Sequence, residues 1–431
     1  MAEPLPGDLP FLPYGRQTVE EEDIAAVAAV LRGDWLTQGP AVTAFERALA
    51  ARVGAADAVA CANGTAALRL AYAALGIGPG DAVVVPSNTF LATASAARHT
   101  GAEVAFADVD PDSGLMGVAE AEAAIARARK AGWRVRALAP VHYAGQTAQM
   151  TGAAGLAALA QAEGLALVED ACHAIGTVDL AGGDLSGGGG TPVGAGRAEV
   201  EAGSLTVFSF HPVKTIAAGE GGAVTGSDPA LMARVRRLCN HGMMRVPEPG
   251  EGFADPDAAL DAEGKPNPWY YEMAEPGFNH RLSDIHAALV LSQLGRLDRF
   301  VERRARLMAL YAERLAPLAP LVRPPALVPW CRPAWHLCAA RIDFDAASDD
   351  ASDAGGRTRS AVMTALRGLG IGTQVHYIPV HRQPYWRRRY GDLALPGAMT
   401  HYAHTLSLPL FPAMADGDVD RVAAALERVL S

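Results

Sequence analysis

Short apolar runs alternate with helix-length segments over the first two thirds of the chain, and this alternation restricts the possible folds more than any other feature. Each run carries strand-forming residues and ends in polar residues. Strands that alternate with helices form a mostly parallel sheet that helices cover on both faces. The sequence therefore predicts an α/β fold. The strand candidates are AVACAN (58–63), AVVVPS (82–87), EVAFADV (103–109), VRALAPV (135–141) and LALVED (165–170).

Segments with apolar residues at helical spacing lie around and between these runs. The helix candidates are EEDIAAVAAVLRG (21–33), VTAFERALAARVG (42–54), TAALRLAYAALG (65–76), MTGAAGLAALAQAEG (150–164) and one long helix over residues 285–318. We expect this long helix to link a large domain (1–285) to a smaller C-terminal α+β domain (286–431). The glycine-rich segment 179–203 is low in complexity and predicts a flexible surface loop.

Composition and charge exclude several classes of protein. The net charge of −10 argues against nucleic acid as the main partner. The prolines of MAEPLPGDLPFLPYG leave no signal-peptide core, and no apolar stretch is long enough to span a membrane. Five scattered cysteines favour a reducing compartment. We expect a cytoplasmic protein that binds no membrane.

A single lysine in the stretch SFHPVKTIAAGEGGAV is unusual, because this chain uses arginine for nearly all of its cations. The only lysines are Lys130, Lys214 and Lys265, and the first and last lie in polar surroundings. Lys214 follows strand-forming residues and precedes a glycine cluster. A desolvated lysine can act as a nucleophile, whereas an arginine cannot. Lys214 is therefore either a reactive lysine or one that extends from a strand end to solvent.

Five other residues could complete a site around Lys214. Asp170 ends a strand and could hold a proton on a ring nitrogen, or it could cap the following turn. Gly64 and Thr65 begin a helix, where a phosphate or simple capping would suit equally. Ser209 adds a hydroxyl donor, and Phe90 could cover a flat ring or belong to the core.

The order of these features resembles that of fold-type I enzymes that use pyridoxal 5′-phosphate (PLP). The chain is most similar to the DegT/DnrJ/EryC1/StrS family of nucleotide-sugar aminotransferases over nearly its whole length. The matching stretches are WLTQGPAVTAFE, NGTAAL, VEDACHAIG, FSFHPVKTIAAGEGGAV, GFNHRLSDIHAAL and LSLPLFP. Within the family, PYGRQ, WLTQGP, PWYYE and QVHYIPVHRQPYW are most similar to the 4-aminotransferases of pseudaminic-acid biosynthesis.

The resemblance implies a PLP enzyme that moves an amino group from L-glutamate to C4 of a UDP-linked 4-keto-6-deoxy-N-acetylhexosamine. Lys214 would bind the cofactor covalently and transfer the proton, Asp170 would pair with the ring nitrogen, and His173 would lie near the ring hydroxyl. The phosphate would be held by Gly64, Thr65, Ser209 and the partner subunit's Asn279, so we expect a homodimer with shared sites. The sugar nucleotide would contact Tyr14, Trp35, Leu36, Thr37, His376 and Tyr377.

Other readings are open at this point. Asp170, Cys172 and His173 could suggest a thiol nucleophile or a metal site, although residues adjacent on one turn rarely converge and we expect no metal. The chain could instead aminate another nucleotide-linked 3- or 4-ketosugar, or bind PLP as a non-catalytic sensor. Relatives that eliminate water have histidine where Lys214 stands, so the lysine favours amino transfer. The insertion around 249–265 lies close enough to the substrate stretches to affect specificity.

Overall fold

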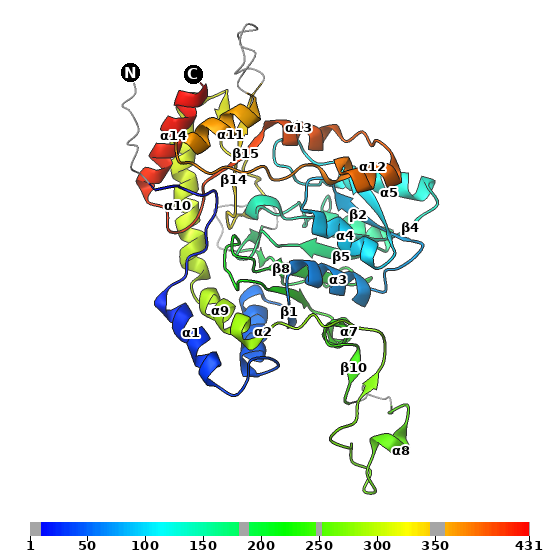
Figure 1. Cartoon of the computed structure of the whole chain (residues 1–431). Helices are drawn as coiled ribbons and strands as arrows, with labels where there is room; N and C mark the ends of the chain where they lie inside the picture. Colours follow the sequence, from blue (N-terminus) through cyan, green and yellow to red (C-terminus); the bar gives the residue numbers. More distant parts are fainter. Residues whose placement is uncertain (1–9, 181–188, 247–251, 345–357, 431) are drawn as a thin grey trace.

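A seven-stranded sheet forms the centre of the molecule in the computed structural model, which describes residues 10–180, 189–246, 252–344 and 358–430 (Figure 1). Its strand order is β1-β9-β8-β5-β4-β2-β3. Only β9 runs antiparallel to its neighbours. The predicted, mostly parallel sheet is confirmed. Its strands are β1 (Asp57–Cys61), β2 (Asp81–Pro86), β3 (Glu103–Ala107), β4 (Arg134–Leu138), β5 (Ala166–Asp170), β8 (Ser204–Ser209) and β9 (Gly222–Gly226).

Helices cover both faces of this sheet because successive strand residues point to opposite sides. In β1, Val59 packs into one buried cluster, which includes α3, while Ala58 and Ala60 pack into another, which includes α2 and α9. The helices of this part are α1 (Glu21–Arg32), α2 (Pro40–Val53), α3 (Gly64–Ala74), α4 (Leu91–His99), α5 (Val118–Lys130), α6 (Leu156–Glu163), α7 (Pro229–Cys239) and α9 (Asp284–Leu294). The helices predicted over 21–33, 42–54 and 65–76 correspond to α1, α2 and α3. Of the helix predicted over 150–164, only the part after Gly155 is helical, as α6.

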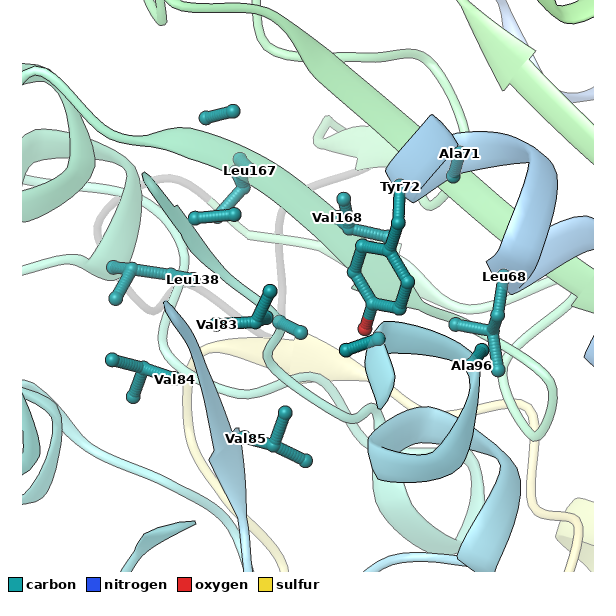
Figure 2. Close-up of a cluster of buried hydrophobic side chains, with 14 of the residues drawn as sticks. Leu68, Ala71, Tyr72, Val83, Val84, Val85, Ala96, Leu138, Leu167 and Val168 are labelled. Atoms are coloured by element: carbon teal, nitrogen blue, oxygen red, sulfur yellow. The ribbon is translucent and has the colours of Figure 1, made fainter. Parts of the chain in front are cut away.

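Tyr72 connects the core to the carboxyl edge of the sheet. Its ring lies in α3 among Leu68 and Val168, close to the valines of β2 (Figure 2). The Tyr72 hydroxyl donates a hydrogen bond of 3.1 Å to the Thr93 carbonyl oxygen in α4. The side chain of Thr93 in turn contacts Asp170 at the end of β5. The buried helices therefore support one of the candidate site residues directly.

A second hydrophobic core lies in the C-terminal part of the chain. It is built around a three-stranded sheet of β12 (Val322–Arg323), β14 (Cys338–Ile342) and β15 (Thr405–Leu408). Leu12 from the N-terminal segment belongs to this core and pairs with Ile371. The predicted domain boundary at residue 285 stays a prediction. The helices of this part are α10 (Leu297–Leu315), α11 (Arg359–Gly368), α12 (Pro384–Tyr390), α13 (Pro396–His404) and α14 (Asp416–Leu430).

The single long helix predicted over residues 285–318 is wrong, because the chain breaks between α9 and α10 at Gly295 and Arg296. Arg296 has non-helical backbone angles of φ −111° and ψ 7°. Its guanidinium group forms ion pairs with Asp23 and Glu20 near the start of α1. Glycine weakens a helix, and this contact fixes the break.

The prediction of a flexible surface loop over 179–203 is wrong for the described part of that segment. β6 (Val178–Asp179) pairs with both β7 (Thr191–Pro192) and β13 (Cys331–Arg332). Arg197 is buried and forms ion pairs with Glu169 and Asp179. The glycine-rich composition concealed this buried network, and residues 181–188 lie outside the described part.

An arm projects from the main body between α7 and α9 (Figure 1). It contains the short strands β10 (Met243–Met244) and β11 (Glu272–Met273), and the short helix α8 (Pro256–Ala259) lies within the inserted stretch. Across the described ranges, we find no helix long and apolar enough to cross a membrane. All five cysteines are free.

Candidate active site

The carboxyl ends of the parallel strands surround a cavity of about 570 Å³. Ligands of open α/β sheets bind at this edge, because the loops that follow the strands converge there. Residues after β1, β2, β4, β5 and β8 all reach the cavity, and the segment 374–377 closes it from the C-terminal part.

Ten of the predicted site residues line this one cavity, and four do not. The ten are Tyr14, Gly64, Thr65, Phe90, Asp170, His173, Ser209, Lys214, His376 and Tyr377. Trp35, Leu36 and Thr37 are exposed elsewhere, and Asn279 is exposed at the base of the arm, where its backbone pairs with Asn240. Within its own chain Asn279 therefore does not line the cavity.

The start of α3 forms a cradle that suits a phosphate group. Asn63 caps the helix by accepting a 2.8 Å hydrogen bond from the Ala66 N–H. The first-turn N–H groups of Gly64 and Thr65 have no carbonyl partner within the helix. A Cβ atom on Gly64 would lie 2.9 Å from Ser209 Cβ, so only glycine allows β8 to approach this closely. The free N–H groups, the helix dipole and the Ser209 hydroxyl together favour an anion.

Asp170, at the end of β5, also lines the cavity and is buried. One carboxylate oxygen accepts a hydrogen bond of 2.7 Å from Thr93 Oγ1. The other accepts a 3.2 Å bond from the Cys172 N–H, so the turn-capping alternative is also satisfied. These contacts fix the carboxylate while it faces the cavity, which a partner for a ring nitrogen requires.

Lys214 lines the same cavity. Desolvation lowers the pKa of its amine, and the nearby Cys172 and Asp170 oppose that effect only in part. No described residue accepts a hydrogen bond or forms an ion pair with its Nζ atom. A half-buried amine with a lowered pKa is available as a nucleophile.

His173 and Tyr377 form a directed hydrogen-bond chain. Burial, with the charge of Lys214, lowers the pKa of His173 well below its usual range, so the ring is neutral. The Ala144 N–H donates to His173 Nδ1 at 3.4 Å, which places the proton on Nε2. Nε2 lies 3.0 Å from the Tyr377 hydroxyl and donates to its oxygen. The hydroxyl proton of Tyr377 is then free to bind a ligand.

Phe90 is not a core residue, so the alternative that it packs in the core is wrong. Its side chain is 56% exposed and lines the cavity, 5.9 Å from the ring of Tyr377. Cys172 is not suited to act as a thiol nucleophile, because burial raises the pKa of its thiol well above the usual range and leaves it protonated. Within the described residues, no group of three or more metal-ligand side chains is placed to hold an ion.

Sequence reasoning missed Thr93 and His336. Thr93 lies three residues after Phe90, but nothing in the sequence there marks a contact with Asp170. His336 comes from the segment before β14 and lies in the cavity wall, with its ring centre 4.4 Å from that of His173. In the sequence this histidine stands between Trp335 and Leu337, and its apolar neighbours give no sign of a site.

The cavity fits PLP in charge and shape. The cradle at Gly64 would hold a phosphate, Asp170 would hold the ring nitrogen, and Phe90 could lie over a flat ring. Lys214 lines the same cavity, as a covalent attachment to the cofactor requires. The close approach at Gly64 and the lowered pKa of Lys214 both suit such a ligand.

Comparison with known proteins decides the family. The model of the DegT/DnrJ/EryC1/StrS aminotransferase family matches residues 17–427. The chain belongs to the DegT/DnrJ/EryC1/StrS family. Members of this family are PLP-dependent, so the chain is a PLP-dependent sugar aminotransferase with the fold-type I architecture.

Relatives within the DegT/DnrJ/EryC1/StrS family span the whole chain. The spore coat polysaccharide biosynthesis protein SpsC of Bacillus subtilis is 37% identical over 97% of both proteins. DesV of S. venezuelae, solved with a ketimine intermediate, is 31% identical over 98% of this chain and 99% of its own, with a TM-score of 0.78. PseC of Helicobacter pylori, an aminotransferase of pseudaminic-acid biosynthesis, has a TM-score of 0.79 over 97% and 99% of the chains. PseC is 24% identical and supports the fold alone.

Proposed function

We propose that the chain transfers the amino group of L-glutamate to C4 of a UDP-linked 4-keto-6-deoxy-N-acetylhexosamine. The observation that carries the transfer is the amine of Lys214, which has a lowered pKa and lines the same cavity as Asp170 and the anion cradle. The sugar class is supported by the stretches PYGRQ, WLTQGP, PWYYE and QVHYIPVHRQPYW. Family membership supports a nucleotide-linked ketosugar as substrate more broadly.

The proposed roles follow from the geometry. When bound, PLP supplies an electron sink that stabilises negative charge on the reacting carbon. Lys214 binds the cofactor, then takes and returns the proton at the reacting carbon as a general base and acid. Asp170 keeps a proton on the ring nitrogen, and Thr93 holds Asp170 in position.

Other cavity residues bind and orient. Gly64, Thr65 and Ser209 hold the phosphate, and Phe90 covers the ring and excludes water. Tyr377 donates its free hydroxyl proton to an oxygen of the ligand, with His173 fixing its direction. Tyr14 and His376, whose rings are 5.4 Å apart, line the side of the cavity that we assign to the sugar nucleotide.

A homodimer with shared sites completes the proposal. Trp35, Leu36, Thr37 and Asn279 lie outside the cavity of their own chain. In a two-fold dimer, such exposed residues can serve the partner's cavity. We propose that Asn279 binds the phosphate in the partner subunit and that the other three contact the sugar nucleotide.

Incubation of the purified protein with nucleotide-linked 3- and 4-ketosugars and ¹⁵N-labelled L-glutamate tests this function. Mass spectrometry and NMR should find the label on C4 of the UDP-linked N-acetylhexosamine. The Lys214→Arg variant is the matched control, because it keeps the charge and should transfer no label. Label on C3, or on a different sugar, would contradict the substrate, and labelling by the control variant would contradict the role of Lys214.

A further inference from the structure

We propose that His336 is a substrate-binding residue. In both substrates it holds an oxygen that is bonded to the carbon next to the reacting carbon. The inference rests on the proposed function and extends it to a residue that has no role in that proposal. In L-glutamate this oxygen belongs to the α-carboxylate. In the 4-ketosugar it is the hydroxyl on C3, beside the ketone carbon.

The first observation is that His336 is buried without hydrogen bonds. Its side chain is 4% exposed and lines the cavity. Nδ1 is buried and has no partner, and no described residue is hydrogen-bonded to Nε2. Buried polar groups in folded proteins almost always have a partner. Nε2 is the less covered of the two nitrogens, and a ligand in the cavity could supply its partner.

The second observation is that the backbone of His336 is fixed on both sides. Its N–H donates to the Ala144 carbonyl oxygen at 2.9 Å, and its own carbonyl accepts from the buried guanidinium group of Arg304 at 3.1 Å. A Cβ atom on Gly145 would lie 2.2 Å from the Ala334 carbonyl oxygen, so the two segments are in close contact. The ring is therefore held rigidly, as a pre-organised ligand contact requires.

The third observation is the charge of the cavity wall. Burial lowers the pKa of His336 well below its usual range, with smaller effects of His173 and Lys214, so the ring is neutral. A neutral ring has one N–H donor and one nitrogen acceptor. With its proton on Nε2, the ring can donate to a carboxylate oxygen or to a hydroxyl oxygen in the cavity.

The fourth observation concerns which other residues of the cavity could bind the α-carboxylate of L-glutamate. Arginine usually binds carboxylates, yet no arginine occurs among the described residues that line the cavity, although this chain is rich in arginine. Lys214 is committed to the cofactor in the proposed function. His336 lines the same cavity as Lys214, and its ring centre lies 4.4 Å from that of His173.

The test compares two substitutions of the same residue. His336→Phe keeps the ring and its contact with His173 but removes both nitrogens, while His336→Asn keeps a donor and an acceptor. The two half-reactions are measured separately by stopped-flow absorbance of the bound cofactor, one with L-glutamate and one with the ketosugar. Calorimetry measures the affinity for glutarate, which does not react, and for PLP.

His336→Phe should lower kcat/KM about 10-fold to 100-fold with both substrates, since a hydrogen bond to a charged or polar ligand is lost. Glutarate affinity should fall by a similar factor, PLP affinity should not change, and His336→Asn should recover part of each loss. His401→Phe is the matched control, because His401 is buried with an unpartnered Nε2 and does not line the cavity. It should retain both rates.

Three results with His336→Phe would overturn the proposal. These are a change in kcat/KM of less than about twofold, a loss of kcat/KM with only one of the two substrates, or a loss that weaker PLP binding explains. An equal loss in His401→Phe would also overturn it, since it would mean a general packing effect. The glutamate half-reaction needs no sugar, so it decides the role of His336 toward the α-carboxylate even where no nucleotide sugar is aminated and the proposed function fails.

Discussion

The N–H group of Ala144 decides which proton His173 presents to the cavity. It donates to Nδ1, so the neutral ring must carry its proton on Nε2 and donate to Tyr377. Tyr377 is then a donor toward the ligand, because burial raises its pKa well above the usual range and keeps it protonated. The polarity of a whole chain of hydrogen bonds thus follows from one backbone contact.

Substitution of His173 tests this polarity. Glutamine can accept from Ala144 and donate to Tyr377, so His173→Gln should keep kcat/KM within about threefold, whereas His173→Leu and Tyr377→Phe should each lose about 10-fold. The double variant His173→Leu/Tyr377→Phe should lose no more than either single variant, because both break the same chain. Steady-state kinetics of all four proteins measure this. Additive losses would mean that the two residues act independently.

Sequence reasoning was strongest for residues whose chemical type is unusual in its context. Lys214 stood out because the chain contains few lysines, and Asp170 because it ends an apolar strand. His336 gave no such signal, since a histidine between Trp335 and Leu337 resembles a residue of an ordinary strand. Its significance lies in two nitrogens without partners, which only the packed structure reveals.

At the scale of elements, the strand β5 presents its two acidic residues to opposite faces. Asp170 faces the cavity, while Glu169 is buried beneath it and contacts His142 and Arg197. Arg197 also pairs with Asp179 of β6. The network therefore joins the segments after β4 and before β8 to β5, and residues after β4 and at the end of β5 line the cavity.

This network predicts a dependence of stability on pH. Burial alone would raise the pKa of Glu169, but the charge of Arg197 and the hydrogen bond from His142 outweigh it and lower the pKa to about 2 from the usual 4.5. A lowered folded-state pKa stabilises the protein above the unfolded-state pKa, and this contribution is lost as the pH falls from about 4.5 to 2. At neutral pH it amounts to about 3 kcal/mol.

Glu169→Gln should therefore lower the free energy of unfolding by about 3 kcal/mol at pH 7 and reduce its slope below pH 4.5. Denaturant unfolding at several pH values measures both quantities. Glu199→Gln is the control, because Glu199 is exposed on a neighbouring part of the same segment. If the two variants have the same stability at pH 7, the buried network does not stabilise the fold.

Strands and helices could be predicted where apolar residues recur at clear strand or helix spacing, as in β2 and α3. Predictions from this spacing and from composition were wrong at two places. The break at Gly295 depends on ion pairs with residues more than two hundred positions earlier, and no local pattern records them. The network of Arg197 lies in a glycine-rich segment whose composition suggested a loop, although long-range ion pairs order it.

At the scale of the whole molecule, the arm exposes apolar side chains that have no packing partner within the described part of a single chain. It extends from the body (Figure 1) and exposes Trp269, Tyr271 and Met273, which are 73%, 55% and 66% exposed. Exposed apolar residues gathered on one projection are typical of a contact surface. Asn279 lies where this arm rejoins the body, and it is exposed outside its own cavity. Both observations agree with the proposed dimer.

Subunit exchange tests whether Asn279 completes the partner's site. Asn279→Ala and Lys214→Ala should each be inactive alone, because one loses a phosphate contact and the other the reactive amine. In a mixed dimer, one cavity would combine the intact Lys214 of one chain with the intact Asn279 of the other. Since about half of randomly exchanged dimers are mixed and each has one intact site, about a quarter of wild-type activity should return. Exchange is verified with differently labelled subunits. If the mixed dimers form but have no activity, Asn279 acts within its own chain and the shared site is contradicted.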